Sequence, residues 1–188
     1  MTSCWTDRVV SRAAVPLAEP HRNRKTPSVI HEPELTPSVR AAMTGADEDT
    51  IHIVAAIAGL LGAVAYADGV YEPAEAHQVR EELGRIRGLS PTGIRTILAV
   101  LERKLVELST IDVVRSARAL RELGDRDLRR EVLEVLLRMA AADGTISTRE
   151  VTTLRQITGA LGLQQSDYNS LQEQYRDLLE ILHKPGPA

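Results

Sequence analysis

The chain has 188 residues, of which 43% are hydrophobic and 26% are charged, enough for one domain with a sizeable core. Its formal net charge of −3 provides no attraction toward nucleic acid or an anionic membrane, so no nucleic-acid partner is predicted. The single cysteine, Cys4, excludes an intrachain disulfide and a cysteine-rich zinc site. Aromatic residues make up 3% and Phe is absent, so the core must be aliphatic, which favours an all-α fold.

Residues 1–46 are predicted to form a disordered, proline-rich, basic tail. The segment has no sustained hydrophobic periodicity, and too little apolar surface to offset the entropy lost on ordering. It also has no apolar stretch of the kind that a secretory signal requires.

Four helices are predicted in the first half of the remaining chain. The first covers residues 51–67 and follows the acidic run 47–49, which favours a helix N-terminus. It is apolar on every face but shorter than the roughly 20 residues of a membrane span, so we predict a buried central helix and no membrane insertion. Further helices begin at Pro73, at Pro91 and at Ser109 or Thr110, because proline and hydroxyl residues favour helix starts.

The second half of the chain repeats the pattern of the first. Ala-Tyr-Ala-Asp-Gly at residues 65–69 corresponds to Ala-Ala-Ala-Asp-Gly at 140–144, and each copy is followed by a helix that ends in a Gly-Leu pair. Repetition of this kind is typical of a duplicated structural unit. We therefore predict about seven helices, arranged as two pseudo-symmetric three-helix halves joined by a linking helix. The domain covers residues 47–184 and is followed by a C-terminal tail, 185–188.

Catalytic motifs are absent from the sequence, and the protein is predicted not to be an enzyme. There is no Gly-x-Ser-x-Gly, His-Glu-x-x-His or glycine-rich phosphate loop. The five histidines are scattered without the spacing of metal ligands.

The acidic residues at the repeated helix ends form the candidate site. In each half an Asp ends one helix, and a Glu seven residues later lies in the first turn of the next. If the halves face each other, these carboxylates form an all-oxygen pocket of the kind that suits Ca²⁺, Mg²⁺ or Mn²⁺. The predicted metal ligands are Asp68, Glu72, Glu75, Asp143 and Glu150.

A structural role for the same residues stays open. Ser147 and Glu150 have the spacing of a capping box, in which each side chain bonds to the other residue's backbone N–H. Asp-Gly pairs are also common in turns. Asp is nevertheless electrostatically unfavourable at a helix C-terminus, so its presence there in both halves suggests a role beyond the turn.

The repeated motifs resemble the TerB-like family, which includes tellurite-resistance TerB and the N-terminal region of DjlA-type co-chaperones. The resemblance rests on Ala-Tyr-Ala-Asp-Gly-Val-Tyr-Glu-Pro-Ala-Glu at 65–75, Ala-Ala-Ala-Asp-Gly-Thr-Ile-Ser-Thr-Arg-Glu at 140–150 and Leu-Gly-Leu at 161–163. It implies an all-helical fold, and a suspected metal cluster at the positions of Asp68, Glu75, Asp143 and Glu150.

The resemblance also implies a cytoplasmic stress-response or tellurite-resistance role, with protein partners in a complex peripheral to the inner membrane. One departure concerns the first half, where the distance from Asp to the Gly-Leu pair is one residue longer and Arg87 stands where the second half has Leu161.

Two alternatives remain beside a cation-binding or partner-binding protein. The first is a metal-independent interaction scaffold, similar to a co-chaperone, in which the carboxylates only cap helices. The second is a carboxylate-dependent metalloenzyme, which requires a concave pocket beside the acids.

Overall fold

The computed structural model describes residues 33–71, 73–108 and 112–179. Over these residues the protein is helical, and extended backbone pairs only in an isolated bridge between Ile146 and Leu179. The all-α prediction is confirmed. The helices are α2 (Thr36–Ala42), α3 (Glu48–Ala65), α4 (Pro73–Gly84), α5 (Pro91–Arg103), α6 (Leu105–Glu107), α7 (Val113–Leu123), α8 (Arg126–Ala140), α9 (Thr148–Ala160), α10 (Gln165–Gln172) and the 3₁₀ helix η3 (Glu173–Leu178).

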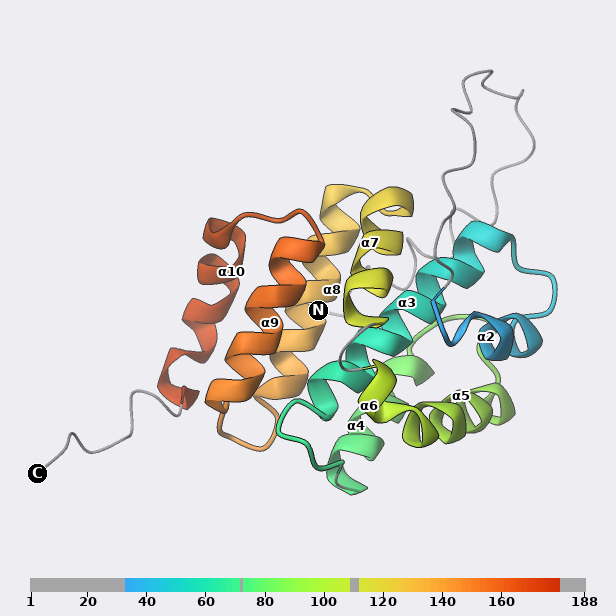
Figure 1. Ribbon diagram of the computed structural model, residues 1–188, viewed down its shortest axis with the longest axis horizontal. Coiled ribbons are helices and arrows are strands. Elements are labelled where there is room, and N and C mark those ends of the chain that lie inside the picture. Colours follow the sequence, from blue (N-terminus) through green and yellow to red (C-terminus); the bar gives the residue numbers. More distant parts are fainter. Residues whose placement is uncertain (1–32, 72, 109–111, 180–188) are drawn as a thin grey trace, which may run out of the picture.

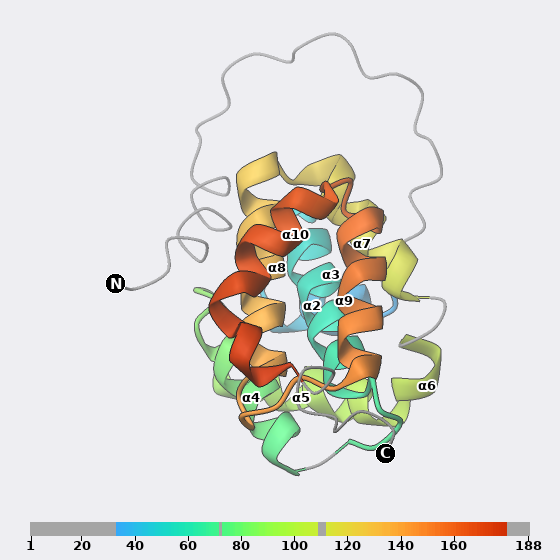
Figure 2. The same cartoon turned by 90° about the vertical axis from the view of Figure 1, so that its left-hand side faces the viewer.

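Helix α3 is the centre of the fold (Figure 1). It contacts α2, α4, α5, α7, α8 and α9, and Figure 2 shows it surrounded by them. Within the described ranges it is the one helix long and apolar enough to cross a membrane, but 83% of that window is buried inside the protein. This burial confirms the prediction of a central core helix.

Two glycines let neighbouring helices approach α3 closely. A Cβ atom at Gly62 would lie 2.7 Å from Leu101 Cδ1 of α5, and one at Gly59 would lie 2.9 Å from Ser116 Oγ of α7. Both distances are shorter than real contacts, so a Cβ atom at either position would force Leu101 or Ser116 to shift from the observed packing.

The predicted boundary of the N-terminal tail is wrong for the part of it that the structure describes. Helix α2 lies within the predicted tail and packs against α3 and α5. Leu35, Val39 and Met43 are buried in the core, so the folded domain begins at least as early as residue 33. Residues 1–32 of the predicted tail lie outside the described residues, as does the C-terminal tail, 185–188.

The seven helices predicted from the sequence are all present. They correspond to α3, α4, α5, α7, α8, α9 and α10. Asp47, Ser90 and Ser147 accept hydrogen bonds from backbone N–H groups in the first turns of α3, α5 and α9, as expected for N-caps. The pseudo-symmetric relation between the two halves stays a prediction.

Candidate functional site

Two Asp-Gly turns adopt the same local geometry, one after α3 and one after α8. Asp68 Oδ1 accepts a hydrogen bond from the Val70 N–H at 2.9 Å, and Asp143 Oδ1 accepts one from the Thr145 N–H at 3.0 Å. Each carboxylate thus closes a turn over the glycine that follows it. The other oxygen of each carboxylate accepts no hydrogen bond from any described residue.

The glycines of the two turns are required by the backbone. Gly69 has φ of 91° and Gly144 has φ of 90°, in the left-handed region that favours glycine. Their N–H groups donate to the carbonyl oxygens of Tyr66 and Ala141 at 3.0 and 3.1 Å. The resemblance between the two motifs in the sequence therefore extends to matching backbone geometry at both turns.

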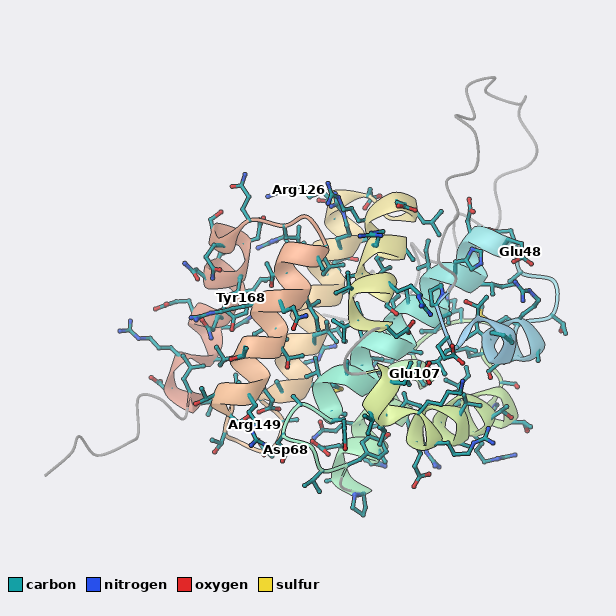
Figure 3. The ribbon with its side chains drawn as sticks, in the orientation of Figure 1. Glu48, Asp68, Glu107, Arg126, Arg149 and Tyr168 are labelled. Carbon is teal, nitrogen blue, oxygen red and sulfur yellow. The ribbon has the colours of Figure 1, made fainter. Side chains whose placement is uncertain are left out.

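The two turns adjoin each other in space. The Arg149 guanidinium, in the first turn of α9, donates a hydrogen bond to the backbone carbonyl of Asp68. Figure 3 shows these two residues side by side at the lower edge of the view. We call this region, defined by Asp68, Asp143, Arg149 and Glu150, the turn junction.

Glu150 links the two aspartates electrostatically. Burial is the main cause that raises the pKa of its carboxyl above the usual value, and hydrogen bonds from Ser147 oppose this. The negative charges of Asp143 and Asp68 raise the pKa further. Since both aspartates act on one carboxyl, residues 75 positions apart in the chain bring negative charge to the same place.

The predicted capping box around Glu150 is confirmed. The Ser147 N–H donates to Glu150 Oε2 at 2.8 Å, and the Glu150 N–H donates to Ser147 Oγ at 3.2 Å. Glu150 is thus held at the start of α9, where its carboxylate accepts a hydrogen bond from the N-cap backbone N–H.

Among the residues that the structure describes, the predicted ligands do not form a metal-binding cluster. Glu75 lies in the first turn of α4, where its charge adds to burial and the Glu102 charge in raising the pKa of Tyr71. Glu72 lies outside the described residues. Among the residues that are described, no group of three or more His, Cys, Asp or Glu side chains is arranged to hold a metal ion. The five-ligand metal site stays a prediction.

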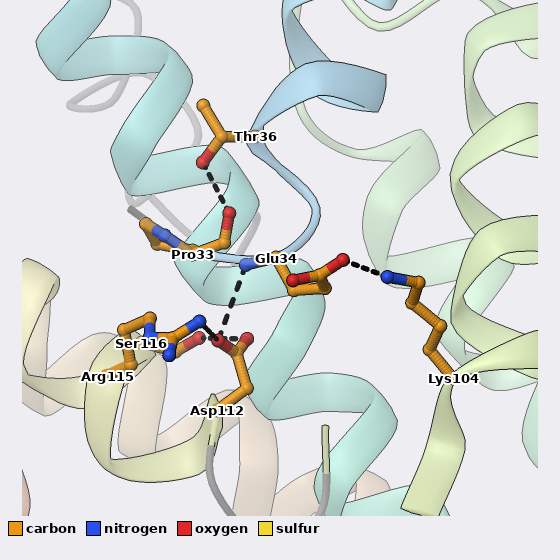
Figure 4. A network of polar contacts seen from close by, with 7 residues as sticks. All are labelled: Pro33, Glu34, Thr36, Lys104, Asp112, Arg115 and Ser116. Atoms are coloured by element: carbon orange, nitrogen blue, oxygen red, sulfur yellow. Dashed lines mark hydrogen bonds and ion pairs between the residues drawn. The ribbon is translucent and has the colours of Figure 1, made fainter. Parts of the chain in front are cut away.

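A buried polar network that the sequence did not indicate fixes the segment before α2 (Figure 4). The Asp112 side chain is 2% exposed, and it accepts hydrogen bonds from the Glu34 N–H at 3.3 Å and from Ser116 Oγ at 3.1 Å. Lys104 forms an ion pair with the Glu34 carboxylate. Burial raises the pKa of Asp112 despite these hydrogen bonds and the Arg115 charge. The network joins the N-terminal segment to α7 and to the end of α5, which gives it a structural role.

The fold and its turns define a class of protein: an all-helical domain around a buried central helix, with a duplicated Ala-Asp-Gly helix end. A family model described as "Tellurite resistance protein TerB" matches residues 54–173, more than half of the chain. The chain belongs to the TerB family. Helix α2 and the start of α3 precede the matched region, whereas both Asp-Gly turns lie within it. No curated protein and no solved structure matches the chain.

Proposed function

We propose that this protein is a non-enzymatic member of the tellurite-resistance family that binds a divalent cation at the turn junction. The main support is the electrostatic effect of Asp68 and Asp143 on one half-buried carboxyl, that of Glu150. Three negative charges gathered at one end of a helical domain repel each other, and a cation relieves that repulsion. In its cation-bound form the junction offers a docking site for protein partners of a cytoplasmic stress-response complex.

The chemistry of the donors favours a hard cation. The groups of the junction that can coordinate a cation are carboxylate and carbonyl oxygens, beside the Arg149 guanidinium. Ca²⁺, Mg²⁺ and Mn²⁺ prefer oxygen ligands. The oxygens of Asp68 and Asp143 that do not close the turns are the candidate ligands, with water completing the coordination shell. An exposed site with so few protein ligands binds weakly, with a dissociation constant on the order of 10⁻⁴ to 10⁻³ M.

The second candidate function is the metal-independent scaffold. The observed capping box and the two aspartate turns give every carboxylate in the junction a structural use without any ion. A metalloenzyme has less support, because the pockets beside α4, α5 and α6 are lined by neither Asp68 nor Asp143.

Calorimetric titration with Ca²⁺, Mg²⁺ and Mn²⁺ separates the first two functions. We expect heat of binding for the wild-type chain, and at least tenfold weaker binding for the double variant Asp68→Asn/Asp143→Asn. Asn retains the oxygen that closes each turn but carries no charge. Equal heats for both proteins with every ion would exclude cation binding at the turn junction and favour the metal-independent scaffold.

The matched control is Asp49→Asn/Asp127→Asn. These two exposed aspartates lie in the first turns of α3 and α8, at the opposite ends of the same helices. For α3 that separation is about 27 Å at 1.5 Å per residue. The control makes the same chemical change far from the junction, so it should leave cation binding at the wild-type level.

A further inference from the structure

A groove between α4 and α5 has the size of a small-molecule site. It has a volume of about 680 Å³, and its lining includes Tyr71, Arg80, Arg95 and Glu102. Volumes of roughly 300 to 1,000 Å³ are usual for pockets that bind small ligands. The groove is separate from the turn junction, and no residue of the junction lines it.

Apolar side chains form part of the groove wall. Ala76 of α4 and Ala99 of α5 line it, together with Leu98, which is 9% exposed. A wall of this kind favours the apolar part of a ligand, since its burial removes hydrocarbon surface from water.

The hydroxyl of Tyr71 is a buried donor without an acceptor. It is shielded from solvent, and no hydrogen-bond partner exists for it among the residues described. Burial, with the charges of Glu102 and Glu75, raises the pKa of Tyr71 to about 12, whereas Arg80 lowers it. The phenol therefore stays protonated at neutral pH. Native proteins rarely leave such a group unpaired. Because solvent does not reach the hydroxyl oxygen, that oxygen does not open onto the groove.

Neither arginine of the groove has an acidic partner among the residues that the structure describes. Arg80 forms no hydrogen bond or ion pair with any described residue, and Arg95 bonds only to Thr92 Oγ1, at 3.0 Å. By contrast, Arg85 and Arg138 both form ion pairs with Glu82. Among the described lining residues, two arginines accompany one acid, Glu102.

We propose that the groove between α4 and α5 binds a small amphipathic organic anion, such as an alkyl carboxylate. Arg80 and Arg95 hold the anionic group, because a guanidinium matches the geometry of a carboxylate. The hydrocarbon part lies on Ala76, Leu98 and Ala99. The ring of Tyr71 completes the wall of the groove. This site does not depend on a cation at the turn junction.

Titration with three probes of equal chain length tests the proposal. Octanoate, 1-octanol and octylammonium share an alkyl chain and differ only in charge, and amide NMR shifts locate each bound probe. Octanoate should shift amides of α4 and α5 and bind at least tenfold more tightly than octylammonium. Equal affinity for all three probes, or octanoate shifts confined to other helices, would overturn the proposal.

Variants assign the binding to the named side chains. Arg80→Gln/Arg95→Gln should weaken octanoate binding at least tenfold and leave octanol binding unchanged. The control Arg118→Gln/Arg130→Gln removes the same charge from exposed positions of α7 and α8 and should bind octanoate like the wild type.

Discussion

Replacing Gly93 by Ala should separate α2 from α5. A Cβ atom added at Gly93 would lie 2.5 Å from Ala42 Cβ and 3.2 Å from Ala42 Cα. Ordinary carbon contacts are about 3.5 to 4.0 Å, so α2 must move by roughly 1 Å. Overpacking of this kind lowers the free energy of unfolding by about 1–3 kcal/mol.

A double-mutant cycle in urea unfolding measures this contact. Ala42→Gly removes the methyl group that Gly93→Ala would strike, so the double variant should recover part of the loss. We expect a coupling free energy of about 1 kcal/mol or more, as is usual for residues in contact.

Gly84→Ala is the control, because nothing lies within 4 Å of a Cβ atom at that position. It should stabilise the protein by up to about 1 kcal/mol through helix propensity alone. If Gly93→Ala were tolerated as well as Gly84→Ala, the docking of α2 described here would be refuted.

Three further predictions concern stability. Leu35→Ala should lower the free energy of unfolding by about 2–5 kcal/mol, since Leu35 is fully buried. An unchanged urea unfolding curve would show that Leu35 does not belong to the core and would support the predicted tail boundary at residue 46. Ser147→Ala should cost about 1 kcal/mol by removing half of the capping box, which thermal unfolding measures; an unchanged melting temperature would contradict that role. Because the folded-state pKa of Glu150 is raised, its contribution to stability is present below the unfolded value of about 4.5 and is lost as pH rises through the folded pKa. Glu150→Gln keeps the cap, so its free energy of unfolding, measured with urea between pH 4 and 7, should decrease less with rising pH than that of the wild type. An identical pH profile would show that Glu150 does not titrate as described.

Local sequence signals predicted most of the helices and both turns. Pro73 and Pro91 occupy the first positions of α4 and α5, and Gly69 and Gly144 adopt the positive φ that ends α3 and α8 in matching turns. These features depend on residues close together in the chain, so the sequence alone can indicate them.

Helix α2 was missed for a reason visible in its residues. Leu35, Val39 and Met43 recur every four residues, which is the spacing of one helical face. Pro37 and the surrounding proline-rich composition obscured this short pattern. The helix is only 7 residues long and packs against α3 and α5, so tertiary contacts, rather than local propensity, stabilise it.

The site was predicted only in part. The repeat placed Asp68 and Asp143 in equivalent turns, and the spacing of Ser147 and Glu150 predicted the capping box. The bond from Arg149 to the Asp68 carbonyl and the groove beside Tyr71 depend on how distant helices pack. No local pattern specifies such contacts.

Paramagnetic broadening by Mn²⁺ tests the cation site at the turn junction most directly. As Mn²⁺ is added to the labelled protein, the amide signals of Gly69 and Gly144 should broaden together and before those of other residues. Simultaneous loss of both signals means that one ion lies near both turns. Broadening at one turn only, or first at the acidic start of α3, would contradict a shared site.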